Sequence, residues 1–153
     1  MGDRWLGWLY VAGQFALVGV LLTEVWDGTT AILPRAAGGL AVAAGLAVMV
    51  AASRHLGREL RTHPAPSSGA TLRVEGPYRL VRHPIYSGLL ISALGLAVAA
   101  GSTTAAATFA VLVGWMTLKA RFEERLLAAR FPGYPEYARR TPRFVPDLLR
   151  RGR

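Results

Sequence analysis

The sequence contains no cysteine among its 153 residues, and charged side chains make up only 18% of it. Without cysteine the chain forms no disulfide, has no thiol nucleophile and binds no metal through a thiolate. Acidic residues are scarce as well, nine against 18 lysines and arginines. The low charge and the 52% hydrophobic content argue against a soluble domain, whose surface needs polar groups throughout.

Three long stretches carry no charge at all: residues 5–23, 36–53 and 84–118. The first two, of 19 and 18 residues, each approach the roughly 20 residues that cross a bilayer. The third would reach about 52 Å as one helix, which is too long for one span. The sequence Ala-Gly-Ser-Thr-Thr at 100–104 predicts a turn within it, with Ser102 or Thr103 as the N-cap of the next helix. We therefore expect an all-α integral membrane bundle of four transmembrane helices, with a cytoplasmic helical extension and a C-terminal tail.

These stretches divide a single expected domain into four parts: two N-terminal spans (1–53), a cytoplasmic loop (54–83), a helical hairpin (84–118), and a cytoplasmic helix with its tail (119–153). The first span lacks the small-residue cleavage site of a signal peptide, so we interpret it as a retained anchor. Small residues on the second and third spans predict close packing of these helices, because lipid supplies no hydrophobic drive for association. These residues are Gly38, Gly39 and Gly45 on one helix and Gly88, Ser92 and Gly95 on the other.

The basic residues are concentrated outside the apolar stretches. Of the 18, all but Arg35 precede the first span, lie within 54–82 or follow residue 118. By the positive-inside tendency, both termini and the long loop are expected on the cytoplasmic side, and the Ala-, Gly- and Arg-rich composition favours a bacterial plasma (inner) membrane. The net charge of +9 is also typical of nucleic-acid binding. Because the basic residues alternate with membrane-length apolar runs, we expect membrane lipids and no nucleic acid as partners.

The loop before the third uncharged stretch contains residues suited to an anion. It reads EGPYRLVRHPIYSG over residues 75–88. Proline disfavours helical backbone in the residue before it and suits the first helical position, so His83 is expected to cap a helix beginning at Pro84. The free N–H groups there, with Arg82 beside them, suit an anion, and the Tyr86 hydroxyl could reach the same place. The alternative is that the arginines only anchor the helix end at the membrane surface.

A charged segment, KARFEERLLAARF, follows the last span over residues 119–131 and continues its helix. Arg121 and Glu124 share a face through their i, i+3 spacing, whereas Glu123 points about 100° away from Glu124. Two carboxylates at the mouth of a membrane bundle, facing a His-Arg anion site, could hold the ammonium of a zwitterion. The alternative is a solvated, salt-bridged helix end.

Two other segments have compositions that suit a functional role. The tail from Phe131 to Pro146 mixes aromatics, prolines and arginines, and we expect it either to lie along the membrane interface or to fold back as a lid. His55, Glu59 and His63 recur every four residues, but Pro64 follows and no fourth ligand is present. We therefore predict no metal site.

Together these segments resemble the isoprenylcysteine carboxyl methyltransferase family, which is related to the membrane phospholipid methyltransferases. The family pattern is a Gly-Pro-Tyr-Arg loop running into Arg-His-Pro-x-Tyr-x-Gly, a helical hairpin, an Arg-x-Glu-Glu helix, and an aromatic tail with proline. The corresponding sequences are GPYRLVRHPIYSG, RFEERLLAARF and GYPEYARRTPRFVP, in the same order, over roughly residues 71–146. Each piece alone is weakly specific, whereas all three in register are specific.

The resemblance implies an S-adenosylmethionine-dependent methyltransferase without a Rossmann-type domain, whose Gly-rich strand-loop-helix unit is absent from the sequence. It places the cofactor in a cytoplasm-facing pocket and a lipophilic acceptor between the helices. The residues it implicates in cofactor binding are Val81 and Pro84 through their backbone, Arg82, His83, Tyr86, Glu123 and Glu124.

The same resemblance leaves two kinds of acceptor open. A carboxylate acceptor is ionised at neutral pH and needs a cation to orient it, for which Arg121 is the first candidate. An amine acceptor, as on a lipid headgroup, needs a base, for which Glu124 is the weaker candidate. A lipid hydroxyl is a further possibility within the enzyme class.

A non-enzymatic alternative is a small membrane transporter or assembly protein. Such proteins usually carry an acidic residue near the middle of the membrane. The acidic candidate here is Glu24, at the end of the first span, which is an interfacial position.

Overall fold

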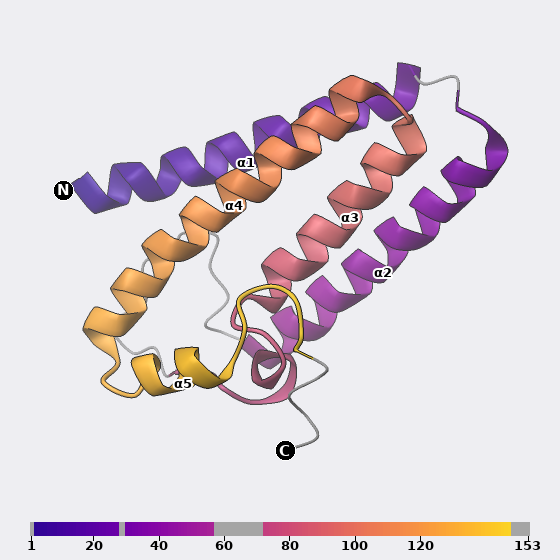
Figure 1. Cartoon of the computed structure of the whole chain (residues 1–153). Coiled ribbons are helices and arrows are strands. Elements are labelled where there is room, and N and C mark those ends of the chain that lie inside the picture. Colours follow the sequence, from indigo (N-terminus) through magenta and orange to yellow (C-terminus); the bar gives the residue numbers. More distant parts are fainter. Residues whose placement is uncertain (1, 28–29, 57–71, 148–153) are drawn as a thin grey trace.

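The computed structural model describes residues 2–27, 30–56 and 72–147, which fold into five α-helices and one 3-10 helix, with no strand among them (Figure 1). The prediction of an all-α fold is therefore confirmed. In chain order the elements are α1 (Gly2–Asp27), α2 (Ile32–Leu56), the 3-10 helix η2 (Gly76–Arg79), α3 (Pro84–Ala100), α4 (Thr103–Arg130) and α5 (Tyr134–Arg140).

Helices α1, α2 and α4 are long and apolar enough to cross a membrane. Helix α3 is also apolar, but its 17 residues reach about 25 Å, somewhat less than the roughly 30 Å of hydrocarbon in a bilayer. It packs against each of the other three helices. Large apolar side chains such as Trp26, Ile32 and Leu40 are exposed on the outside, where lipid would cover them. The chain is thus an integral membrane protein with three full-length helices and a shorter fourth.

The hairpin between α3 and α4 forms where the sequence predicts it. Gly101 ends α3 in the left-handed conformation, with φ of 64°, which glycine adopts without strain. The hydroxyl of Ser102 accepts the N–H of Ala105 at 2.9 Å and so caps α4. The same hydroxyl donates to the carboxylate of Glu24 at 2.5 Å, which ties the end of α1 to this turn. Glu24 therefore has a structural partner at the turn.

Helices α2 and α3 lie side by side and approach closely through small residues (Figure 1). A Cβ atom on Gly45 would collide with the carbonyl of Gly88 and with Ser92, and one on Gly38 would collide with the carbonyl of Gly95. The predicted glycine contact is confirmed at these positions. Gly39 differs from the prediction, because it is exposed and a Cβ there would meet nothing within 4 Å. It points away from α3.

This packing predicts that Gly45→Val destabilises the protein whereas Gly39→Val does not. Forcing a larger side chain into a filled interface costs about 1–3 kcal/mol or more, and the backbones of α2 and α3 leave no room to relax. Thermal unfolding in detergent, followed by circular dichroism, measures the difference. Equal melting temperatures for the two variants would contradict the close approach of the helices.

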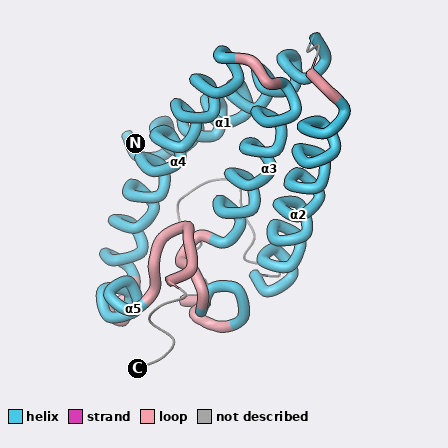
Figure 2. The backbone as a smooth tube through the Cα atoms, turned by 45° about the vertical axis from the view of Figure 1, so that its right-hand side comes forward, coloured by secondary structure: helices cyan, strands magenta, loops and turns pink. Residues whose placement is uncertain are grey.

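Loops gather at the end of the bundle that lies opposite the α3–α4 hairpin. There η2, α5 and the segment after α5 lie beside the start of α3 (Figure 2). On α4, the charged part after Leu118 extends to this end. The uncharged part of α4, Thr103 to Leu118, belongs to the apolar bundle. The residues that the sequence singles out for chemistry therefore lie at or next to one end of the molecule.

Candidate functional site

The site is built around the first turn of α3. As predicted, His83 caps this helix and Pro84 is its first residue. The His83 side chain is buried, with 6% exposed, and its ring stacks on that of Tyr86 one turn later, with centroids 5.1 Å apart and planes within 3°. The sequence Arg-His-Pro-x-Tyr thus places an imidazole and a phenol against each other at the edge of the bundle.

The C-terminal tail folds back over this turn. The backbone N–H groups of Arg82 and His83 donate to the carbonyls of Pro142 and Arg143 at 2.8 and 3.1 Å. The Ser87 hydroxyl donates to the next carbonyl along the tail at 2.6 Å. Of the two arrangements expected for the tail, the one over the start of α3 is observed.

Glu124 is at the centre of a cluster of charged side chains. Arg143 donates to both of its oxygens, from Nε at 2.9 Å and from Nη2 at 2.8 Å. His83 Nε2 lies 3.1 Å from Oε1, and Arg82 Nη2 lies 3.6 Å from the same oxygen. One carboxylate from α4 therefore joins the start of α3 to the tail.

Glu123 approaches the same imidazole from its other nitrogen. Its Oε2 accepts the hydroxyl hydrogen of Tyr86 at 2.7 Å and lies 3.7 Å from His83 Nδ1. Although Glu123 and Glu124 diverge around the helix, His83 lies between them, so the two carboxylates serve one cluster. We name this cluster the charge site; its members are Arg82, His83, Tyr86, Glu123, Glu124 and Arg143.

The environment of Glu124 keeps its carboxylate ionised. Burial by itself raises the pKa of Glu124, but the hydrogen bonds from Arg143 and His83 and the positive charge of Arg82 outweigh burial and lower this pKa to about 2. A group with so low a pKa has little affinity for a proton, so it is a poor general base near neutral pH. Glu124 is thus placed to hold cations, and its role as a base toward an amine acceptor remains a prediction.

Tyrosines of α5 hold this helix against the site. The hydroxyl of Tyr137 donates to the carbonyl of Tyr78 in η2 at 2.6 Å. Burial raises the pKa of Tyr137 to about 12, although Arg82 acts in the opposite direction, so the hydroxyl remains a donor. The hydroxyl of Tyr134 is also buried, but it has no hydrogen-bond partner within the described ranges.

These two tyrosines form a matched pair for mutation. Tyr137→Phe is expected to lower the free energy of unfolding by about 1 kcal/mol, because it leaves a carbonyl of η2 without its donor. Tyr134→Phe is expected to be neutral or slightly stabilising, since it removes a buried hydroxyl that has no partner. Chemical denaturation in detergent compares them. A greater loss of unfolding free energy for Tyr134→Phe than for Tyr137→Phe would contradict the hydrogen bonding described for these two hydroxyls.

Other residues singled out from the sequence take different positions. Val81 and Pro84 are buried beside His83. Arg121 is exposed and forms no hydrogen bond or ion pair with any residue that the structure describes, so its proposed role toward the acceptor remains a prediction. Sequence reasoning missed Arg143 as a site residue. In the sequence, Arg143 is one of several arginines in the tail, and the pattern does not distinguish it from the others.

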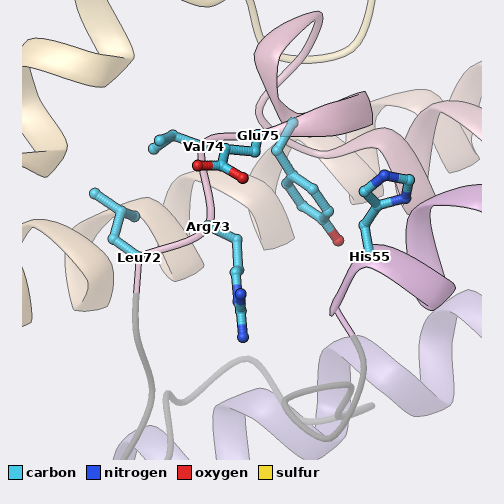
Figure 3. A pocket seen from close by; sticks show the side chains of 6 residues that line it. His55, Leu72, Arg73, Val74 and Glu75 are labelled. Carbon is cyan, nitrogen blue, oxygen red and sulfur yellow. The ribbon is translucent and has the colours of Figure 1, made fainter.

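The prediction of no metal site concerns His55, Glu59 and His63, which lie before η2 in the sequence. Glu59 and His63 lie outside the described residues, and His55 lines a cavity of about 240 Å³ next to η2 (Figure 3). Among the residues that are described, no group of three or more His, Asp or Glu is placed to hold a metal ion. The other residues lining this cavity are Leu72, Arg73, Val74, Glu75 and Tyr78.

The fold and the charge site define an apolar helical membrane bundle with a buried polar site at one end. The family model described as phospholipid methyltransferase matches residues 33–133. This match covers most of the chain, including α2, α3 and α4, so the chain belongs to the phospholipid methyltransferase family.

Individual relatives match about half of the chain. The cobalt-zinc-cadmium resistance protein CzcN of Cupriavidus metallidurans is 45% identical over 79 residues, which are 51% of this chain and 37% of that protein. The nickel-cobalt-cadmium resistance protein NccN of Alcaligenes xylosoxydans xylosoxydans is 40% identical over 74 residues, 48% of this chain and 35% of that protein.

A plant enzyme matches to a similar extent. Protein-S-isoprenylcysteine O-methyltransferase B of Arabidopsis thaliana is 42% identical over 78 residues, 49% of this chain and 39% of that protein. The chain therefore matches well under half the length of each of these three relatives. No solved structure gives a significant match.

Proposed function

We propose that this protein is an S-adenosylmethionine-dependent methyltransferase that acts on a lipophilic acceptor, first of all a carboxylate. The observation that carries the proposal is the charge site, in which His83 bridges Glu123 and Glu124 beside two arginines at one end of a membrane bundle. Membership of a methyltransferase family supports the reaction class. The relative whose name specifies O-methylation of isoprenylcysteine supports the choice of acceptor.

The free groups at the charge site fit the amino-acid end of S-adenosylmethionine, which carries an ammonium and a carboxylate. Oε1 of Glu123 forms no hydrogen bond within the described part of the chain, so it is available to an ammonium. The Nε of Arg82 is buried with no acceptor among the same residues, so it is available to a carboxylate. Unpartnered buried groups are uncommon in proteins, and the Nε of Arg82 is such a group. The Glu123 side chain is 24% exposed, so the two groups of opposite sign lie where a ligand could reach the carboxylate.

The residues of the chain would act mainly by binding and positioning. When bound, the cofactor supplies a methyl group on a sulfonium, which is already electrophilic. Glu123 and Arg82 would hold its amino-acid end, and His83 would keep the two glutamates in place. Most of the acceleration then comes from holding acceptor and methyl carbon together, which needs no proton transfer when the acceptor is a carboxylate.

The proposed location is the bacterial plasma membrane, with the charge site on the cytoplasmic side. The distribution of arginines supports this orientation, because η2 and α5, which include Arg79, Arg139 and Arg140, lie toward the same end as the charge site (Figure 2). A cytoplasmic opening would admit the polar cofactor, whereas a lipophilic acceptor would enter from the bilayer.

A product assay tests the choice of acceptor. The purified protein would be incubated with methyl-labelled S-adenosylmethionine and either N-acetyl-S-farnesylcysteine or phosphatidylethanolamine. The proposal predicts a product from the carboxylate that releases labelled methanol in base, as methyl esters do. A base-stable methylamine formed from the phospholipid instead would replace the carboxylate acceptor with an amine and retain the reaction class.

A further inference from the structure

Lys119 is the only lysine in the chain, where the other 17 basic residues are arginines. It is also one of the most buried side chains, with 2% of its surface exposed. It lies on α4 directly after the uncharged stretch, among α1, α3 and α4. Lysine differs from arginine in carrying a compact charge whose three N–H donors rotate freely. A single buried lysine in an arginine-rich membrane protein therefore indicates a role that arginine would not fill.

The ammonium of Lys119 is incompletely partnered. Nζ donates to the side-chain carbonyl of Gln14 on α1 at 2.7 Å and lies 4.9 Å from the centre of the Tyr86 ring. No carboxylate of the described residues forms an ion pair with it. Gln14 is thus its one hydrogen-bond acceptor among the residues that the structure describes. The negative charge of Glu123 acts on this ammonium from beyond ion-pair distance. In membrane proteins buried ionisable groups of this kind mark functional sites.

Lys119 also lies next to the charge site. It precedes Glu123 by one helical turn, so both residues lie on the same face of α4. The ring of Tyr86 connects them, because Lys119 approaches its face and its hydroxyl donates to Glu123. The ammonium is therefore at the junction between the apolar bundle and the proposed cofactor site, where a lipophilic acceptor and a methyl donor would meet.

We propose that Lys119, held by Gln14, binds the anionic group of the methyl acceptor and selects carboxylates over amines. This inference rests on the proposed methyltransferase function and makes its acceptor site specific. One carboxylate oxygen would accept hydrogen bonds from Nζ, which supplies the acceptor that the ammonium lacks. A protonated amine would instead be repelled by the positive charge of Lys119.

The transfer step balances without a proton. The second carboxylate oxygen forms a bond to the methyl carbon while the carbon–sulfur bond breaks, and the electron pair of that bond stays on sulfur. The sulfonium becomes a neutral thioether, and the carboxylate becomes a neutral ester. Lys119 keeps its charge throughout and needs only to orient the acceptor. It replaces Arg121 as the orienting cation, because Arg121 is exposed on the outside of α4.

The test compares Lys119→Met with Arg125→Met, an exposed cation on the same helix. With N-acetyl-S-farnesylcysteine, Lys119→Met is expected to lower kcat/KM at least 30-fold and to retain the affinity of the wild type for S-adenosylhomocysteine. Arg125→Met is expected to stay within about twofold in both. Unchanged kcat/KM in Lys119→Met would overturn the inference. Loss of S-adenosylhomocysteine binding in this variant would also overturn it, because Lys119 would then support the cofactor site.

Stability provides a separate readout. Removing a buried charge together with its polar partner is often neutral or stabilising, so Gln14→Leu/Lys119→Met is expected to melt at or above the wild-type temperature. A much lower melting temperature would show a structural role and would overturn the inference. Failure of the proposed methyltransferase function gives a result that is distinguishable from failure of the inference about Lys119. In that case the wild type neither binds S-adenosylhomocysteine nor methylates any acceptor.

A direct measurement uses the wild-type protein. Because the chain has one lysine, protein labelled with ¹⁵N-lysine has a single Nζ resonance. We expect this resonance to shift on addition of N-acetyl-S-farnesylcysteine and to stay in place with its carboxamide. No shift with the acid, under conditions where the acid is methylated, would place the acceptor away from Lys119.

Discussion

Glu124→Gln is expected to weaken the binding of S-adenosylhomocysteine by at least about 30-fold. Glu124 is the common partner of Arg143, His83 and Arg82, and the substitution keeps its shape while removing its charge. Truncating one partner of a buried, hydrogen-bonded charge pair costs about 2–5 kcal/mol, because the other charges lose their counter-charge. The backbone hydrogen bonds between the start of α3 and the tail would remain. The side chains of Arg82, His83 and Arg143 would lose their common anionic partner, so the groups that fit the cofactor would no longer be held together. Isothermal titration calorimetry in detergent measures the affinity.

Glu136→Gln is the matched control for this variant. Glu136 also pairs with arginines, with Arg140 Nη2 at 2.6 Å, but it does so on the exposed face of α5. Exposed ion pairs contribute about 0–1 kcal/mol, so the affinity for S-adenosylhomocysteine should remain near that of the wild type. If both variants bind equally well, Glu124 does not organise the cofactor site.

His83→Ala is expected to weaken S-adenosylhomocysteine binding by about 10- to 150-fold and to leave the protein folded. The imidazole touches both glutamates and stacks on Tyr86, so its loss frees three side chains of the charge site at once. Hydrogen bonds to charged groups contribute about 1.5–3 kcal/mol each, which corresponds to this range. The same titration gives the affinity, and circular dichroism reports on folding.

The control for this prediction is His55→Ala. His55 is exposed at the end of α2, and its Nδ1 lies 2.9 Å from the carbonyl of Ala51 in the same helix. Its removal should leave the affinity unchanged. Wild-type affinity in His83→Ala would remove the imidazole from the site while leaving the account of the fold intact.

Much of this architecture could be predicted from local sequence patterns. The absence of charge over 84–118, with a Gly-Ser-Thr break, predicts the hairpin, because helix length and capping are local properties. The proline after His83 likewise predicts the start of α3. The glycines that face each other across α2 and α3 are visible as a periodic pattern. Gly39 shows the limit of that pattern. It is the neighbour of Gly38 in the sequence, but it lies on a different face of α2 and does not contact α3.

The contacts that complete the charge site could not be predicted in this way. Arg143 reaches Glu124 only because the tail turns back after α5, and several other arginines of the tail have the same chemistry. The pairing of Lys119 with Gln14 joins residues that are more than 100 positions apart, on two helices whose relative rotation no local pattern fixes. The sequence indicates Arg121 as the first candidate to orient an acceptor and does not single out Lys119. Burial distinguishes these two cations, and burial depends on the packing of α1 and α3.

The central claim is that the charge site binds the methyl donor. Calorimetric titration of the detergent-solubilised wild-type protein with S-adenosylhomocysteine, in parallel with His83→Ala, tests it most directly. We expect saturable binding at one site per chain, weakened about 10- to 150-fold in His83→Ala. Absence of binding by wild-type protein that is shown to be folded would contradict it, and the charge site would then serve only to join α3, α4 and the tail.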